Sequence, residues 1–180
     1  TVFGFDPDGT LLVTEDENLS KFTRSVDAVN RTTEIDVTTI SGPIGTTLQT
    51  FEYDGRGLVT RLTDNNDPSN SDDDSTVKFV YDSLGRVVEE SQQIGSMSPR
   101  VTSSAWRSDN LRSGLTYPNG RRINFSFDLD DRLDTITEVT TGELLIGYSY
   151  IGGGNRVLER HHLANGTRLT SLNDAGDQNV

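Results

Sequence analysis

The sequence predicts an all-β protein in which tandem β-hairpins build one continuous antiparallel sheet. Three observations predict it: a short motif recurs along the chain, the segments between motifs alternate apolar and polar side chains, and amphipathic helix spacing is hard to find. A period of two is typical of strands with one buried face. Tandem recurrence indicates a repeated structural unit. We therefore expect a single array over residues 1–180, with about seven units.

The recurring motif is an aromatic residue followed by Asp, with a turn-forming residue three positions after the Asp. Random placement of 12 Phe or Tyr and 19 Asp predicts roughly one aromatic–Asp step, and the chain has four. The four clear copies are Phe5-Asp6 with Gly9, Tyr53-Asp54 with Gly57, Tyr81-Asp82 with Gly85, and Phe127-Asp128 with Asp131. Weaker copies contain Asp27 with Asn30, Trp106-Arg107 with Asn110, and Tyr150-Ile151 before a glycine run.

Each motif predicts a tight hairpin turn. The third residue after the Asp suits a positive φ, where Gly has no Cβ penalty and Asn a small one. The Asp carboxylate can accept a hydrogen bond from the backbone two residues on. Tyr81 and Val87 should then face each other across the hairpin. Arg31, Arg86 and Arg132 follow their turns, so we expect each to form a solvated ion pair with the motif Asp.

The strands between motifs show the alternation of a half-buried sheet most clearly in one segment. Ile123, Phe125 and Phe127 alternate with Asn124 and polar neighbours. We expect one dry face and one solvated face. A second turn signal, Pro118-Asn119-Gly120, predicts a hairpin inside the repeat as well as at its motif.

One acidic segment interrupts the array of repeats. Residues 64–75 are rich in Asp, Asn and Ser, and this composition predicts an exposed loop inserted into the array. Dense oxygen ligands make it a calcium candidate, although it lacks the glycine and glutamate positions of an EF-hand. The weak candidate ligands are Asp64, Asp67, Asp72, Asp73 and Asp74.

Composition excludes several functional classes. The net charge is −12, so nucleic acid is a poor partner, since such binding depends on clustered Lys and Arg. No apolar run is long enough to span a bilayer. Cysteine is absent, which excludes disulfides and thiolate chemistry. Only 32% of residues are hydrophobic, so any core is thin. The chain begins at Thr1 without a visible signal peptide, and we expect a mature piece or an excised segment.

The quoted phrases resemble the YD repeats of the Rhs family. The residues that carry the resemblance are Tyr81-Asp82-Ser83-Leu84-Gly85-Arg86, Leu115-Thr116-Tyr117-Pro118-Asn119-Gly120 and Asn155-Arg156-Val157-Leu158. The resemblance covers nearly the whole chain, except the acidic insertion and the termini. It implies a spiralling sheet that forms a hollow shell, as in bacterial polymorphic toxins, the C components of insecticidal toxin complexes, and teneurins. About seven repeats are too few to close such a shell.

No catalytic constellation stands out. Asp130 with Asp131, and Glu89 with Glu90, are adjacent carboxylates, but neighbouring strand residues point to opposite faces. His161 and His162 fail as a metal or base pair for the same reason. The glycines at 152–154 lack the Lys and the following helix of a phosphate-binding loop. We expect no enzyme activity.

The sequence therefore favours a non-enzymatic structural segment of a secreted or cell-surface YD-repeat protein. Its expected partners are the remainder of a larger YD-repeat chain or other copies of itself, without nucleic acid and without membrane insertion. Two alternatives stay open. One is a surface adhesion module that binds a glycan, with or without calcium. The other is a subunit of an extracellular filament that assembles through open sheet edges.

Overall fold

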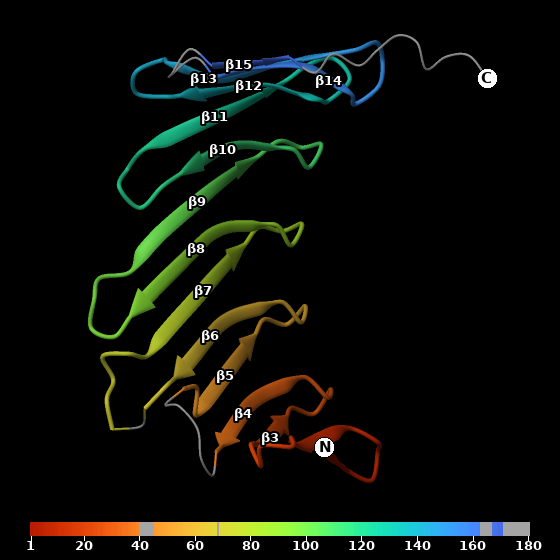
Figure 1. Cartoon of the computed structure of the whole chain (residues 1–180), viewed down its shortest axis with the longest axis vertical. Coiled ribbons are helices and arrows are strands. Elements are labelled where there is room, and N and C mark those ends of the chain that lie inside the picture. The colour runs from red at the N-terminus through yellow and green to blue at the C-terminus, as the bar shows by residue number, and fades with distance from the viewer. Residues whose placement is uncertain (40–44, 68, 163–166, 171–180) are drawn as a thin grey trace, which may run out of the picture. The chain divides into compact units, whose positions relative to one another are not determined.

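The computed structural model describes residues 1–39, 45–67, 69–162 and 167–170. These residues form fifteen antiparallel strands and no helix, and the order of the strands in the sheet follows the order of the chain (Figure 1). The predicted all-β fold class is thus confirmed. The strands are β1 (Val2–Phe5), β2 (Leu11–Glu15), β3 (Lys21–Val26), β4 (Thr32–Thr38), β5 (Leu48–Tyr53), β6 (Val59–Asn65), β7 (Ser75–Tyr81), β8 (Val87–Ile94), β9 (Arg100–Trp106), β10 (Arg112–Thr116), β11 (Arg122–Phe127), β12 (Leu133–Glu138), β13 (Leu144–Tyr150), β14 (Val157–His162) and β15 (Thr167–Thr170).

The chain divides into two compact units, Thr1–Val101 and Thr102–Val180. In the first unit the motif turns between β5 and β6 and between β7 and β8 lie at one end of the strands, and the described part of the connection between β6 and β7 lies at the other end (Figure 1). The second unit, taken by itself, has the same alternation between β9 and β13. Within each unit, the motif turns therefore lie at the same end of the hairpins.

A one-residue register shift accompanies the motif aromatic in most hairpins. In β5 and β6, Glu52 pairs with Arg61 whereas Tyr53 pairs with Val59. The same shift makes Tyr81 pair with Val87, as the sequence predicts. The shift lies one residue pair beyond the turn, so it is a separate bulge with one extra residue, such as Thr60, on the strand that leaves the turn. Further shifts lie at Gly4/Phe5, Ser25/Val26, Ser126/Phe127 and Ser149/Tyr150.

The apolar face of the sheet is half-buried, and the expectation of a dry face was wrong. Strand β3 alternates strictly between exposed and partly buried residues, as a one-sided sheet should. However, Ile123, at 7% exposure, is the one buried hydrophobic residue within the described ranges. A single layer has no second sheet or helix to cover its apolar side. Hydrogen-bonded strand ladders and side-chain contacts between neighbouring hairpins must therefore carry much of the stability.

Glu138 is the buried charged residue of the described part of the chain, also at 7% exposure. Its Oε2 accepts hydrogen bonds from the backbone N–H of Thr141, at 2.6 Å, and from the Thr141 hydroxyl, at 2.7 Å. These two bonds, the hydroxyl first, lower the pKa of the Glu138 carboxyl to about 2. The carboxylate thus closes the connection between β12 and β13.

Replacing Ile123 with Ala should destabilise the protein more than replacing Leu129 with Ala. Truncation at Ile123 removes buried methyl groups, and we expect a loss of about 2 kcal/mol, at the low end for such changes because the site is covered on one side only. Leu129 is fully exposed, so its truncation should stay within about 0.5 kcal/mol. Urea unfolding followed by circular dichroism measures both. Equal losses would contradict this location of the core.

Candidate functional site

The site that repeats along the chain is the row of motif turns. In each, the backbone N–H of the first residue donates to the C=O of the fifth, and the N–H of the fourth donates to the C=O of the first. This pattern holds for residues 6–10, 27–31, 54–58, 82–86, 107–111 and 128–132. A seventh turn is one residue longer, because the N–H of Ile151 donates to the C=O of Arg156. We call these seven segments the motif turns.

The fourth residue of each five-residue motif turn adopts a positive φ. Glycine takes this position where the sequence provides it, as in Gly57 at +86° and Gly85 at +79°. Gly has no Cβ, so the left-handed region costs it little. The remaining fourth residues are Gly9 (+84°), Asn30 (+63°), Asn110 (+68°) and Asp131 (+57°).

The motif Asp binds the backbone of its own turn. In the turn at 82–86, Asp82 Oδ1 accepts the N–H of Leu84 at 2.9 Å and that of Arg86 at 3.0 Å. Oδ2 accepts the Arg86 Nε at 2.7 Å. The Arg86 N–H contributes most to lowering the pKa of this carboxyl, against the opposing effect of burial. The charged form of Asp82 therefore holds the turn closed.

Other motif turns repeat this arrangement with small variations. Asp6, Asp27, Asp54 and Asp128 each accept the N–H groups two and four residues on. For Asp27 and Asp54 the N–H four residues on is the largest cause of a lowered pKa. Burial of Asp128 raises its pKa, but the bonds from Arg132 outweigh this effect and lower it. In the turn at 107–111, Asp109 supplies the carboxylate, and it accepts the N–H of Leu111 at 3.3 Å.

The expected arginine–aspartate ion pairs are present. Arg31 pairs with Asp27 at 2.6 Å, and Arg86 pairs with Asp82 at 2.7 Å. Arg132 pairs with Asp128 at 2.7 Å. In the turn at 54–58 the arginine lies two positions earlier, and Arg56 pairs with Asp54 at 2.9 Å. Such partly exposed pairs contribute little alone, on the order of 0.2 to 1 kcal/mol each.

The same arginines also reach the next hairpin along the chain. Arg31 lies 4.6 Å from the ring centroid of Tyr53, and its Nη1 donates to the C=O of Asp54 at 3.3 Å. Arg56 Nη1 donates to the C=O of Asp82 at 2.9 Å. An arginine over an aromatic face gains roughly 0.5 to 1 kcal/mol at exposed sites and more where water is excluded. Arg31 and Arg56 thus each bind their own turn and the following one.

The second unit repeats these contacts. Arg132 lies 4.6 Å from the Tyr150 ring, and its Nη1 donates to the C=O groups of Gly152 and Gly154, at 2.8 and 2.9 Å. The glycine run predicted as a loop or bulge therefore presents carbonyls to the preceding hairpin. Arg107 takes the corresponding position over Phe127, at 5.4 Å.

The motif tyrosines add a hydrogen bond in the reverse direction. Tyr53 Oη donates to the C=O of Thr32 at 2.7 Å, and Tyr81 Oη donates to the C=O of Val59 at 2.7 Å. Tyr150 Oη donates to the C=O of Leu133 at 2.6 Å. Each acceptor lies five residues after the first residue of the preceding motif turn. Burial raises the pKa of the Tyr81 and Tyr150 hydroxyls, so both stay protonated and donate. We call the arginine and tyrosine contacts together the forward brace.

Two features of this site were missed from the sequence. The forward brace joins residues 17 to 26 positions apart, and only the spacing of neighbouring hairpins brings them together. A further turn at 16–20 has the same backbone pattern, with Asp16 accepting the N–H groups of Asn18 and Ser20 and with Leu19 at a φ of +61°. Its signal was an Asp followed by Asn between two strand patterns, without the aromatic residue.

The five calcium candidates lie around the connection between β6 and β7. Asp64 is in β6 and Ser75 is in β7, so the strands extend into both ends of the expected insertion. Asp67 accepts both the N–H and the hydroxyl of Ser69, and Asn66 donates to the C=O of Asp73. Pro68 lies outside the described residues. Within the described ranges, no three acidic or histidine side chains converge as a metal site would require.

The carboxylate and histidine pairs weighed from the sequence do not converge on a substrate site. Glu89 pairs across the sheet with Val80 and Glu90 with Phe79. Asp130 contacts Arg132 at 3.2 Å, and Asp131 contacts Arg107 at 3.5 Å, within the row of motif turns. His161 Nε2 lies 2.7 Å from Glu159 Oε1 on the same strand. The His162 side chain lies outside the described residues.

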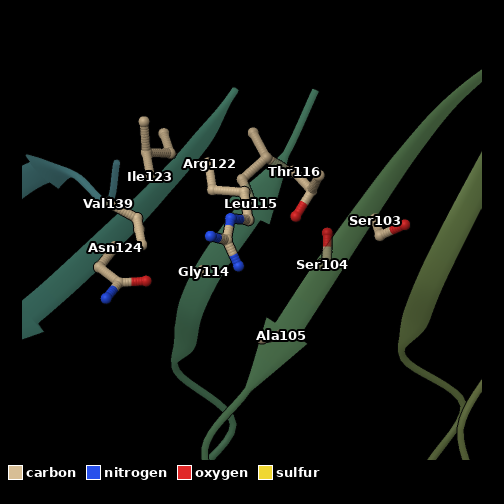
Figure 2. Close-up of a pocket in the computed structure, with 10 residues that line it drawn as sticks. All are labelled: Ser103, Ser104, Ala105, Gly114, Leu115, Thr116, Arg122, Ile123, Asn124 and Val139. Atoms are coloured by element: carbon tan, nitrogen blue, oxygen red, sulfur yellow. The ribbon is translucent and has the colours of Figure 1, made fainter. Parts of the chain in front are cut away.

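A shallow hollow of about 220 Å³ lies on the second unit, over β9, β10 and β11 (Figure 2). Ser104 and Ala105 line it with small side chains and Gly114 with none, beside the longer Arg122. Its lining contains no Asp, Glu, His or Lys, so the described hollow lacks the general acids and bases of a hydrolytic site.

No family model and no curated protein sequence matches the chain. Comparison with solved structures is informative for the fold. A structure of the Photorhabdus luminescens Tc holotoxin pore with a TccC3 variant matches 93% of this chain and 10% of the other chain, with a TM-score of 0.61 and 14% identity. A crystal structure of TcdB2-TccC3-TEV matches 90% of this chain and 11% of the other, with a TM-score of 0.44 and 13% identity.

The first of these matches carries the fold assignment. Together with the hairpin array and the motif turns, it shows that the chain has an Rhs/YD-repeat-like fold. The resemblance in the Tyr-Asp phrases is therefore confirmed at the level of fold. The chain spans about a tenth of the length of the matched protein.

Replacing Gly85 with Val should destabilise the protein more than replacing Ser83 with Val. A Cβ at Gly85 would meet Leu58 Cδ1 at 3.5 Å, an ordinary contact, so the cost comes from the φ of +79°. We expect a loss of about 1 to 2 kcal/mol or more, because a β-branched residue is forced into the left-handed region. Thermal melts of the two variants measure the difference. Equal melting temperatures would contradict the turn assignment.

The stability of the protein should fall as the pH drops below the ordinary Asp pKa of 3.8. A carboxyl whose pKa is lower in the folded state contributes stability above its unfolded pKa, and that contribution is lost as the pH falls through the folded pKa. Asp82→Asn should be less stable than the wild type at neutral pH and should lose less stability on acidification. Urea midpoints from about pH 5 to about pH 2 measure this. Ser83→Ala, without a titrating group, should retain the wild-type pH dependence.

Proposed function

We propose that the chain is a non-enzymatic structural segment of a secreted or cell-surface YD-repeat protein. In this proposal its sheet forms part of the wall of a shell or rod that encloses or displays other domains. The observation that carries the proposal is the forward brace, because the side chains at the motif turns bind the next turn of the same sheet. A ligand-binding site would instead direct such side chains toward a cavity.

The chemistry of the faces supports a wall. Charged side chains at the motif turns are satisfied locally, as in Arg86 with Asp82 and Arg132 with Asp128. The sheet is one layer thick, and its apolar side is only half-buried. Such a layer gains stability when other strands extend it or other domains cover it. The described residues contain no helix long and apolar enough to cross a membrane.

The fold of the Tc toxin structure supports the same role, since 93% of this chain aligns within a much longer protein. By analogy, the partner of this segment is the remainder of a larger chain. Secretion and enclosure of another domain are what the YD-repeat resemblance implies, and they form part of the proposal.

Electron cryo-microscopy of the native protein that contains this chain tests the proposal. We expect the strands to continue into further strands at both ends and to form one wall around or beneath another domain. A separate lobe whose edge strands pair with nothing would overturn it. A glycan array, with and without chelator, tests the adhesion alternative. Binding that the chelator abolishes would favour that alternative, and no binding to any glycan would support the structural role.

A further inference from the structure

The unpaired edge of β1 carries exposed apolar side chains. Val2, Phe3 and Phe5 are 63%, 56% and 62% exposed, and β2 covers β1 on one side only. By contrast, the rings of Tyr53, Phe127 and Tyr150 are half-buried, each with an arginine of the preceding hairpin within 5.4 Å of its ring centroid. Phe5 occupies the same position in its hairpin as these three rings and has no such cover.

Arginine and ring alternate in a fixed order along the described hairpins. Each of the five motif turns from 27–31 to 128–132 contains an arginine and is followed by an aromatic residue at the motif position of the next hairpin. The five steps are Arg31 to Tyr53, Arg56 to Tyr81, Arg86 to Trp106, Arg107 to Phe127 and Arg132 to Tyr150.

The one step without an arginine is also the one without a ring. The turn at 6–10 contains no arginine, and the motif position of the next hairpin is Val26. The presence of an aromatic residue at the motif position therefore correlates with an arginine in the turn of the preceding hairpin, and not with the sequence of its own turn. By this rule, Phe5 requires an arginine that no residue of the described chain supplies.

We infer that the β1 edge binds a preceding hairpin whose motif turn carries an arginine, and that this arginine covers Phe5. The inference rests on the proposed function and names its partner at this edge. The occupant is a segment of the same protein that lies ahead of Thr1. Its second strand pairs antiparallel with β1, and its arginine donates to the C=O of Asp6, as Arg31 does to Asp54 and Arg56 does to Asp82.

Strand order favours this occupant over a second copy of the chain. Every described pair joins an odd-numbered strand to an even-numbered one. If a second copy added end to end through the described strands, β15 would lie beside β1. Both are odd-numbered, so the alternation of odd- and even-numbered strands, and the forward brace that recurs with it, would be interrupted. The second strand of a preceding hairpin corresponds to an even-numbered strand, so placing it beside β1 continues the alternation.

A fusion tests the inference with the chain's own hairpin as the probe. Residues 48–76 are duplicated ahead of Thr1. Phe5 then follows the copied turn by the same number of residues as Tyr81 follows the original turn. The matched control carries Arg56→Ala in the copy alone. Both fusions are also made with Phe5→Val, the side chain that Val26 has naturally. Hydrogen exchange of the β1 amides is measured in all four.

We expect the copied hairpin to protect β1, and Arg56→Ala to reduce this protection about fivefold when residue 5 is Phe, in line with the strength of an arginine–ring contact. With Phe5→Val the same change should have little effect, so the two substitutions should be coupled. Equal protection with and without the copied arginine would overturn the inference while leaving sheet extension, and thus the proposed function, intact. An unprotected β1 in all four fusions would overturn the docking itself.

Sedimentation of the unfused chain examines the competing occupant. We expect monomers at micromolar concentration, because the β1 edge then binds a preceding hairpin and not a second copy. A concentration-dependent dimer in which β1 becomes protected would overturn the inference in favour of a second copy.

Discussion

The carboxylate of the motif Asp is the interaction on which the rest of the structure depends. By accepting two backbone N–H groups of its own turn, Asp82 fixes the direction in which the strand returns. The positive φ of Gly85 follows from the same geometry. Once the turn is set, Arg86 is held beside the carboxylate, and in equivalent turns the guanidinium is oriented toward the next hairpin. Loss of the turn would therefore remove both the hairpin and its link to the next one.

Local hydrogen bonds matter more here than in most globular domains. A three-layer or two-layer fold hides large apolar side chains, whereas this sheet leaves most of them half-exposed. The balance between burial and chain entropy is thus less favourable for each hairpin alone. Contacts of modest individual strength, such as Tyr53 Oη with Thr32 and Arg31 with Tyr53, become important because they recur in successive hairpins.

Sequence reasoning predicted what is encoded within one hairpin. The Asp, the residue at positive φ and the alternating strands are local signals, so the fold class, the Tyr81–Val87 pair and the Arg–Asp ion pairs could be predicted. The forward brace could not, because it depends on which side chains two hairpins bring together across connections of variable length. The extent of burial was also misjudged, since an alternating pattern shows which face is apolar but not whether anything covers it.

The forward direction of the arginine contacts gives the array a chemical polarity from its N-terminus to its C-terminus. A ribosome releases the hairpins in the same order, so the turn that carries each guanidinium is synthesised before the ring that the guanidinium covers. Assembly can then proceed one hairpin at a time on a template that the previous hairpin has completed.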